Sequence, residues 1–353
     1  MKKKCYVLVA AFLAGALLLS GSVVSAAPRP TTVAELAFYQ GADRQQILEE
    51  GARKEGKLFL RTVHIVNQVV RPIVNGFQKR YPYIKVEIWR GGSAQLAPMV
   101  FEEYKAGRYF VDVITTSQSG GMVLEEMGIL QPFYSSNQAN IEEGAAKKAP
   151  GGGAFHIGNF VNGKSMGYNT KLISKDQLPK SHQDLLDPKW KGKMALAGSN
   201  TGVSWMGTML VTYGEDFVRQ LAKQNFDVHM ISGRAILDLV VAGEYPLSPA
   251  IFDSHVTYSK QRKAPVDWVP LEPVNCNLGQ VVLPKHSAHP HAAMLYIDFE
   301  LSKKAGEVYK AAGYSSLRKD IVNPVTYKKY FGPESTKQLK EWTKLFNELF
   351  VSK

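Results

Sequence analysis

The sequence contains very little cysteine. Cys5 and Cys276 are its two cysteines in 353 residues, which excludes a disulfide scaffold and a cysteine-rich zinc site. Cys5 falls in an N-terminal segment that we expect to be removed. Cys276 would then be alone, and we expect it to be a small buried apolar residue.

Long apolar runs are also scarce. The clearest one, at residues 7–19, follows Lys2, Lys3 and Lys4 and precedes the small residues Val24-Ser25-Ala26. This order is typical of a secretory signal peptide. A membrane anchor is the alternative, but a bilayer-spanning helix needs about 20 apolar residues. We therefore expect a signal peptide at residues 1–26 and a periplasmic or extracellular protein after cleavage.

Acidic residues are fewer than basic ones. Lysine and arginine number 43 against 31 aspartates and glutamates, a net charge of +12. Residues 1–26 contain three of these lysines and no acidic residue, so the net charge of the remaining chain is +9. The other lysines are scattered in short pairs such as Lys147-Lys148, and no dense basic arm is present. Together with export, this argues against nucleic acid. A membrane surface, an anionic ligand and a merely soluble surface stay open.

Hydrophobic periodicity predicts alternating helices and strands. In the first half, helices are predicted at 43–56, 69–77 and 96–104, and strands at 57–60, 84–88 and 111–114. This order is typical of a mostly parallel, doubly wound α/β sheet. After a glycine loop at 151–153, a second region contains strands at 194–196, 268–269 and 281–283, and helices starting near 202, 232, 290 and 339. The length suggests two domains, or one domain split into two lobes.

Several signatures of catalysis are missing. The sequence has no Gly-x-Ser-x-Gly elbow, no His-Glu-x-x-His pair and no phosphate-binding Gly-x-x-x-x-Gly-Lys-Ser/Thr loop. A hydrolase stays as an alternative, because the residues of a catalytic triad need not be close in sequence.

The histidines offer a weak metal pattern. His286, His289 and His291 are close in sequence, but no carboxylate lies among them and Pro290 is typical of the first position of a helix. We expect exposed polar residues ahead of a helix and no metal site. His64 follows the first strand, where ligand-binding loops of open α/β sheets lie. It is either a ligand-binding residue or a solvated loop residue.

Anion-binding chemistry is better represented. The loop Ser199-Asn200-Thr201 lies between a strand and a helix, so its backbone N–H groups suit an anion. An ordinary helix cap explains it equally well. Arg234, near the start of a later helix, could bind a carboxylate or phosphate, or form a surface ion pair. Phe252, Asp253 and His255 suit either a ligand cleft or an aromatic cluster at the core edge.

These segments together resemble a known family. They are Gly56-Lys57-Leu58, the run 77–86, Asp112-Val113-Ile114, Gly167-Tyr168-Asn169-Thr170, the run 188–193, Val241-Ala242-Gly243-Glu244 and the run 292–302. Their order resembles the extracellular solute-binding proteins of ABC importers, in the group that includes ferric-ion binders. The resemblance rests on the order and spacing of these segments, and no single motif identifies the family.

The resemblance implies a two-lobed type II periplasmic-binding-protein fold of class α/β. Each lobe would be a mostly parallel sheet flanked by helices, and hinge strands would join the lobes. The lobes would be residues 27–163 with 281–312, and residues 164–280 with 313–353. A monomer without cofactor would close on its ligand and deliver it to a membrane permease and its ATPase.

The resemblance departs from ferric binders at the metal ligands. Their adjacent tyrosines correspond to Asp253-Ser254 here, an acidic ligand to Ser117, and an early histidine to a position near Val66, close to His64. We therefore predict an organic anion: a carboxylate, phosphonate or phosphate ester. A ferric ion or ferric chelate is the alternative, and a secreted hydrolase a more remote one. The predicted ligand-binding residues are His64, Ser93, Thr116, Ser117, Ser199, Asn200, Thr201, Arg234, Phe252, Asp253 and His255.

Overall fold

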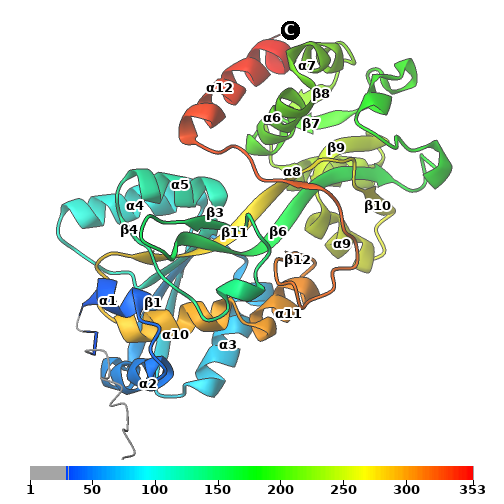
Figure 1. The fold of residues 1–353 in the computed structure, drawn as a ribbon. Coiled ribbons are helices and arrows are strands. Elements are labelled where there is room, and N and C mark those ends of the chain that lie inside the picture. Colours follow the sequence, from blue (N-terminus) through cyan, green and yellow to red (C-terminus); the bar gives the residue numbers. More distant parts are fainter. Residues whose placement is uncertain (1–28, 31, 353) are drawn as a thin grey trace, which may run out of the picture.

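Two lobes joined by long strands make up the protein. The computed structural model describes residues 29, 30 and 32–352, without the side chains of residues 93 and 94. The expected signal peptide lies outside the described residues. Figure 1 shows one lobe below and one above, with β6 and β11 running from one to the other. Among the described helices, none has the length and hydrophobicity that a bilayer crossing requires.

The lower lobe is a parallel sheet extended by an antiparallel hinge strand. β1 (Lys57–Thr62) pairs in parallel with β2 (Lys85–Arg90) and with β3 (Val113–Ser117), and β3 pairs antiparallel with β11 (Val274–Pro284). Its helices are α1 (Val33–Phe38), α2 (Arg44–Glu55), α3 (Arg71–Arg80), α4 (Ser93–Lys105), α5 (Gln118–Glu126), α10 (Pro290–Glu300) and α11 (Lys303–Ala311). The predicted β-α-β-α-β order at residues 57–117 is confirmed.

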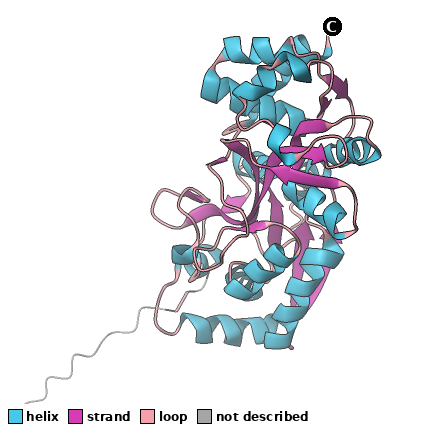
Figure 2. Ribbon diagram, turned by 90° about the vertical axis from the view of Figure 1, so that its right-hand side faces the viewer, coloured by secondary structure: helices cyan, strands magenta, loops and turns pink. Residues whose placement is uncertain are grey.

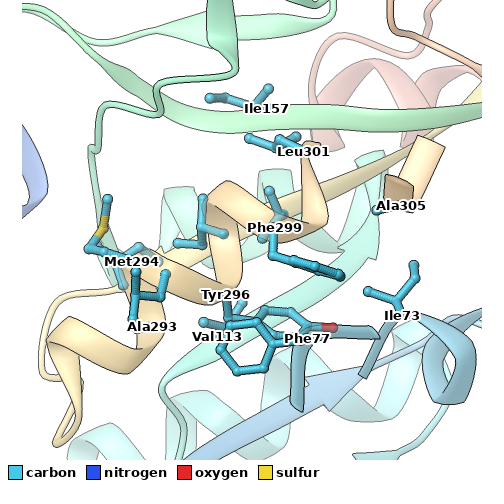
Figure 3. Close-up of a cluster of buried hydrophobic side chains, with 14 of the residues drawn as sticks. Ile73, Phe77, Val113, Ile157, Ala293, Met294, Tyr296, Phe299, Leu301 and Ala305 are labelled. Carbon is cyan, nitrogen blue, oxygen red and sulfur yellow. The ribbon is translucent and has the colours of Figure 1, made fainter. Parts of the chain in front are cut away.

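Helix α10 is the centre of the lower core. Almost all of its residues are buried, because it packs between α2, α3 and the sheet. Figure 3 shows Tyr296 and Phe299 of α10 gathered with Phe77 of α3. The Phe77 ring meets both of these rings edge-on, at centroid distances of 5.2 and 5.7 Å. Such packing makes this lobe a rigid base for the loops that end its strands.

The upper lobe has a smaller sheet and its own core. β9 (Leu247–Phe252) and β10 (Val266–Val269) pair with β6, and β7 (Ala195–Ala197) pairs with β8 (Asp227–His229). Its helices are α6 (Asn200–Tyr213), α7 (Glu215–Ala222), α8 (Gly233–Ala242), α9 (Asp253–Gln261) and α12 (Thr336–Phe346). Figure 2 shows helices on the outside of both lobes around the strands.

Glycine at one position lets the C-terminal helix approach. A Cβ built on Gly207 of α6 would lie 2.0 Å from the Trp342 ring of α12. Trp342 and Phe346 then join the buried upper core. Before α12, the chain crosses from the lower lobe to the upper one through β12 (Ser315–Ser316) and β13 (Lys329–Tyr330), drawn in orange to red in Figure 1.

The position of hinge strand β6 is the main feature that hydrophobic periodicity did not predict. β6 (Ala154–Asn169) has 16 residues, of which 15 are buried. Its first half pairs with β5 (Ala146–Lys148) and β12 in the lower lobe, and its second half pairs with β9 and β10 in the upper one. Burial on both faces removes the alternation of apolar and polar residues by which strands are predicted. The two-lobed architecture is confirmed. The expectation of a mostly parallel sheet is wrong for the upper lobe, because β9 and β10 both pair antiparallel with the hinge strand β6. The residue boundaries of the lobes stay a prediction.

Candidate functional site

Three adjoining cavities lie between the lobes. The Lys164 cavity, of about 200 Å³, is lined by Ser117, Gln118, Ser119, Lys164, Asn200, Thr201, Ser204, Phe252, Cys276, Asn277, Gly332, Pro333 and Leu339. The His64 cavity, of about 280 Å³, is lined by Val63, His64, Ile65, Gly92, Ser117, Phe160, Asn162, Asn277, Gly279 and Tyr314. The Arg234 cavity, of about 290 Å³, is lined by Ile65, Gln68, Arg234, Ser254, His255, Tyr258, Ala312 and Tyr314. The Lys164 and His64 cavities share Ser117 and Asn277, and the His64 and Arg234 cavities share Ile65 and Tyr314.

The starts of two helices meet at the Lys164 cavity. Ser117 caps α5 of the lower lobe, where its Oγ accepts from the Gly120 N–H at 3.4 Å. Ser199 caps α6 of the upper lobe, where its Oγ accepts from the Thr201 N–H at 3.4 Å. The partial positive charge of a helix N-terminus favours a bound anion. The lobes thus present two such ends to one cavity.

Lys164 supplies a full positive charge in the same cavity. It lies on hinge strand β6, its residue is 7% exposed, and its Nζ donates to Asn275 Oδ1 of β11. The ammonium also lies 5.6 Å from the centroid of the Phe252 ring. Among the described residues, no carboxylate lies within ion-pair distance of it. Burial therefore lowers the pKa of Lys164 to about 8.

Sequence reasoning missed Lys164 because the segment around it resembles a loop. One signal could have revealed it. From Ala149 to Thr170, Lys164 is the only lysine, arginine, aspartate or glutamate. A single charge in a long uncharged stretch indicates either an exposed turn or a buried functional group, and only the fold distinguishes these.

His64 is buried, so the solvated-loop alternative is wrong. Its residue is 7% exposed, and its ring meets the Phe160 ring edge-on at 4.9 Å. Burial lowers the pKa of His64 to about 4, so the ring is neutral at neutral pH. Nδ1 lies 3.4 Å from the Tyr309 hydroxyl, and Nε2 is buried with almost no exposed surface.

Arg234 and His255 line the Arg234 cavity, and the Ser199–Thr201 loop does not line it. Arg234 donates to Asp238 Oδ1 at 2.8 Å and to Ser259 Oγ at 3.0 Å, and its side chain is 41% exposed. It therefore forms the surface ion pair that was one of the two alternatives. Burial, and next the nearby Arg234, lower the pKa of His255 to about 4.

Other predicted residues lie behind the cavities. Asp253 is buried and accepts from the Tyr327 hydroxyl at 2.8 Å, and burial raises the pKa of its carboxyl to about 7. Thr116 is buried, with no partner for Oγ1 among the described residues. Neither residue lines one of the three cavities. Ser93 begins α4, and its side chain lies outside the described residues.

The clustered histidines have structural partners. His289 Nδ1 lies 2.8 Å from Asp112 Oδ2, and His291 Nδ1 lies 2.6 Å from Glu55 Oε1. His289 is buried, so the expectation of exposed residues is wrong for it. In the part of the chain that the structure describes, no three His, Cys, Asp or Glu residues are placed to hold a metal ion. Cys276 is buried, as predicted, and burial raises the pKa of its thiol to about 12.

Comparison with protein families identifies the group to which this chain belongs. The model of the family described as bacterial extracellular solute-binding protein matches residues 109–336, more than half of the 353-residue chain. The chain belongs to this family. The family match includes the hinge strands, Lys164 and the starts of α5 and α6.

Curated relatives match over shorter stretches. The Fe(3+)-binding periplasmic protein of Serratia marcescens is 33% identical over 132 residues, which are 37% of this chain and 37% of that protein. A Haemophilus influenzae protein named only as uncharacterized is 26% identical over 194 residues, 52% of this chain and 56% of that one. The chain thus spans about half, or less, of the length of these relatives.

Solved structures match over nearly their whole length. Iron-bound HitA from Pseudomonas aeruginosa has a TM-score of 0.67 and 22% identity, covering 83% of this chain and 99% of that one. AfuA from Actinobacillus pleuropneumoniae, with fructose-6-phosphate bound, has a TM-score of 0.64 and 19% identity, covering 85% and 100%. At these identities the likeness shows the fold, and the predicted type II periplasmic-binding-protein fold is confirmed.

Proposed function

We propose that this chain is the solute-binding component of an ABC importer and captures a small organic anion in the Lys164 cavity. The observation that carries the proposal is the buried Lys164 ammonium, which lies between two helix starts and has no carboxylate partner among the described residues. A buried unpaired charge is costly, and proteins usually pair or neutralise it. An anionic ligand would supply the negative charge that Lys164 lacks among its neighbours.

The chemistry of the cavity matches a carboxylate, phosphonate or phosphate ester. Lys164 gives the charge, and Ser117, Ser119, Thr201 and Ser204 bring hydroxyl groups. Asn200 and Thr201 lie in the first turn of α6, where backbone N–H groups have no partner within the helix. Of the predicted residues, Ser117, Asn200, Thr201 and Phe252 line this cavity, and Ser199 acts through the cap of α6.

A bare ferric ion suits this cavity less well. The Lys164 ammonium repels a cation, and the Asp253 carboxyl is turned to Tyr327. The Serratia relative is nevertheless named as an Fe(3+)-binding protein, and the Pseudomonas structure is iron-bound, so a ferric ligand stays the alternative. A ferric chelate with an anionic surface would meet the same lysine and helix starts as an organic anion does.

The proposal extends to the transport cycle. The protein would act outside the cytoplasm as a monomer, after removal of the signal peptide. Its lobes, with the predicted boundaries, would close by bending of β6 and β11, and the closed form would dock on a permease coupled to an ATPase. No chemical change of the ligand is part of this role.

The ligand that accompanies the purified protein tests the proposal. Small molecules released by denaturation would be identified by mass spectrometry, and calorimetry would compare phosphate, acetate and citrate. We expect an organic anion to be released and at least one of the three to bind. A neutral or cationic ligand, with none of the three anions bound, would contradict the proposal. A visible charge-transfer band on adding Fe(III) without citrate would favour the ferric alternative instead.

A further inference from the structure

The His64 cavity adjoins the Lys164 cavity and has a different character. The two cavities share Ser117 and Asn277, so a molecule held by its charged group at Lys164 has room to extend into the His64 cavity. That cavity contains no lysine, arginine, aspartate or glutamate among its lining residues. It therefore suits the uncharged part of a ligand.

Rings and glycines form the walls of the His64 cavity. The Phe160 ring lies 4.9 Å from the His64 ring and 4.5 Å from the Tyr314 ring. Gly92 and Gly279 also line it and present no side chain. Burial raises the pKa of Tyr314 to about 12, so its phenol is uncharged at neutral pH. Aromatic faces beside bare backbone favour a flat ring, which makes offset or edge-on contacts there.

A polar network behind the cavity holds the His64 ring in place. Tyr309 Oη donates to Glu300 Oε1, and Asn159 Nδ2 donates to Tyr309 Oη at 2.9 Å. Because the Tyr309 proton is engaged by Glu300, its oxygen is the acceptor for His64 Nδ1–H at 3.4 Å. The ring also has a backbone hydrogen bond with Thr116, and its Nε2 atom is buried with almost no exposed surface. The neutral His64 ring is therefore a fixed part of the cavity wall.

We infer that the ligand is an anion built on a flat ring, with its charged group in the Lys164 cavity and its ring in the His64 cavity, against the rings of Phe160 and Tyr314. The inference rests on the proposed function and narrows its substrate class. Phe160 and Tyr314 would be specificity residues, separate from the group that binds the charge.

Calorimetry with a graded series of phosphates tests the inference. The probes are inorganic phosphate, methyl phosphate and phenyl phosphate. Burial of a phenyl ring should make phenyl phosphate bind about 10- to 100-fold more tightly than methyl phosphate. Equal affinities for methyl and phenyl phosphate would overturn the inference.

Two variants separate the ring from the charge. Gly92 has φ −79° and open space around a built Cβ. Gly92→Leu should reduce the preference for phenyl phosphate, and Gly92→Ala is its matched control. An undiminished preference in Gly92→Leu would contradict the assignment of the ring to this cavity.

The same series distinguishes failure of the inference from failure of the proposed function. If inorganic and methyl phosphate bind and the ring adds nothing, the ring inference is wrong and the anion site stands. If no phosphate binds, acetate and benzoate are tested as the corresponding carboxylate pair. Absence of binding by all of these anions would overturn the inference. The proposed function would be overturned as well if citrate also failed to bind and the purified protein released no organic anion.

Discussion

Lys164 and Arg234 are two cations beside the same cleft, and their surroundings differ. Arg234 is 41% exposed at its side chain and is already paired with Asp238, one turn along its own helix. Lys164 is buried, and among the described residues it has a neutral amide oxygen as its hydrogen-bond partner. A cation that already has a counter-ion gains little from an anionic ligand. A buried cation without one gains a great deal.

The largest effect should come from removing the Lys164 charge. Lys164→Met should weaken binding of phenyl phosphate by between 100- and 1000-fold, because a buried ion pair loses one partner. Lys171→Met, at an exposed lysine two residues beyond β6, is the matched control and should bind like the wild type. Calorimetry at pH 7 measures both. A loss of less than fivefold in Lys164→Met would show that the charge is held elsewhere.

The same substitution should stabilise the protein without ligand. The pKa of Lys164 falls from 10.5 to about 8 on folding, so burying the charged form costs about 3 kcal/mol at pH 7. Losing the hydrogen bond to Asn275 offsets about 1 kcal/mol of this. We expect Lys164→Met to raise the free energy of unfolding by about 2 kcal/mol at pH 7, measured by urea denaturation.

The pH dependence of this stability difference has a definite sign. Between pH 8 and 10.5 the unfolded chain holds the Lys164 proton more firmly than the folded one, so wild-type stability rises with pH relative to the variant. The advantage of Lys164→Met should therefore shrink as the pH rises above 8. An advantage that is constant up to pH 10 would contradict burial of a charged lysine.

The cap of α6 should have an intermediate effect. Ser199→Ala removes the side chain that accepts from the Thr201 N–H, and loss of a cap costs about 1 kcal/mol of stability. Binding of phenyl phosphate should weaken a few-fold, because the start of α6 becomes less ordered. Ser199→Asp keeps a cap and restores stability, but its carboxylate repels the anion. Equal binding by Ser199→Asp and the wild type would exclude an anion near this helix start.

The smallest effect should come from Arg234. Its pair with Asp238 is exposed, and such pairs contribute about 0 to 1 kcal/mol. Arg234→Ala should change the affinity for phenyl phosphate less than threefold and the free energy of unfolding by less than about 1 kcal/mol. A loss comparable to that of Lys164→Met would reverse the comparison and make Arg234 the main anion ligand.

Much of the fold could be predicted from the sequence. The helix ending at Gly56, the strands of the lower lobe and the caps at Ser199 and Ser232 follow local rules of periodicity, capping and turn geometry. These elements were predicted close to their observed bounds, because each has one apolar face or a distinct end.

The hinge and the central cation could not be predicted in the same way. β6 is buried on both faces and contains Gly158, Gly163 and Gly167, so its local pattern resembles a loop. The role of Lys164 depends on which residues face it across the cleft, and these come from α5, α6, β9 and β11. The position of Arg234 near a helix start suggested an anion ligand. Asp238, four residues later, indicated a surface ion pair equally well.

The affinity for phenyl phosphate as a function of pH tests the role of Lys164 most directly. A phosphate monoester has its second pKa near 6, so this probe keeps its charge above pH 7.5. The pKa of Asp253, about 7, also lies below this range. We predict that Kd rises about tenfold per pH unit above pH 8 in the wild type and stays constant to pH 9.5 in Lys164→Arg. A Kd independent of pH in the wild type would contradict the account.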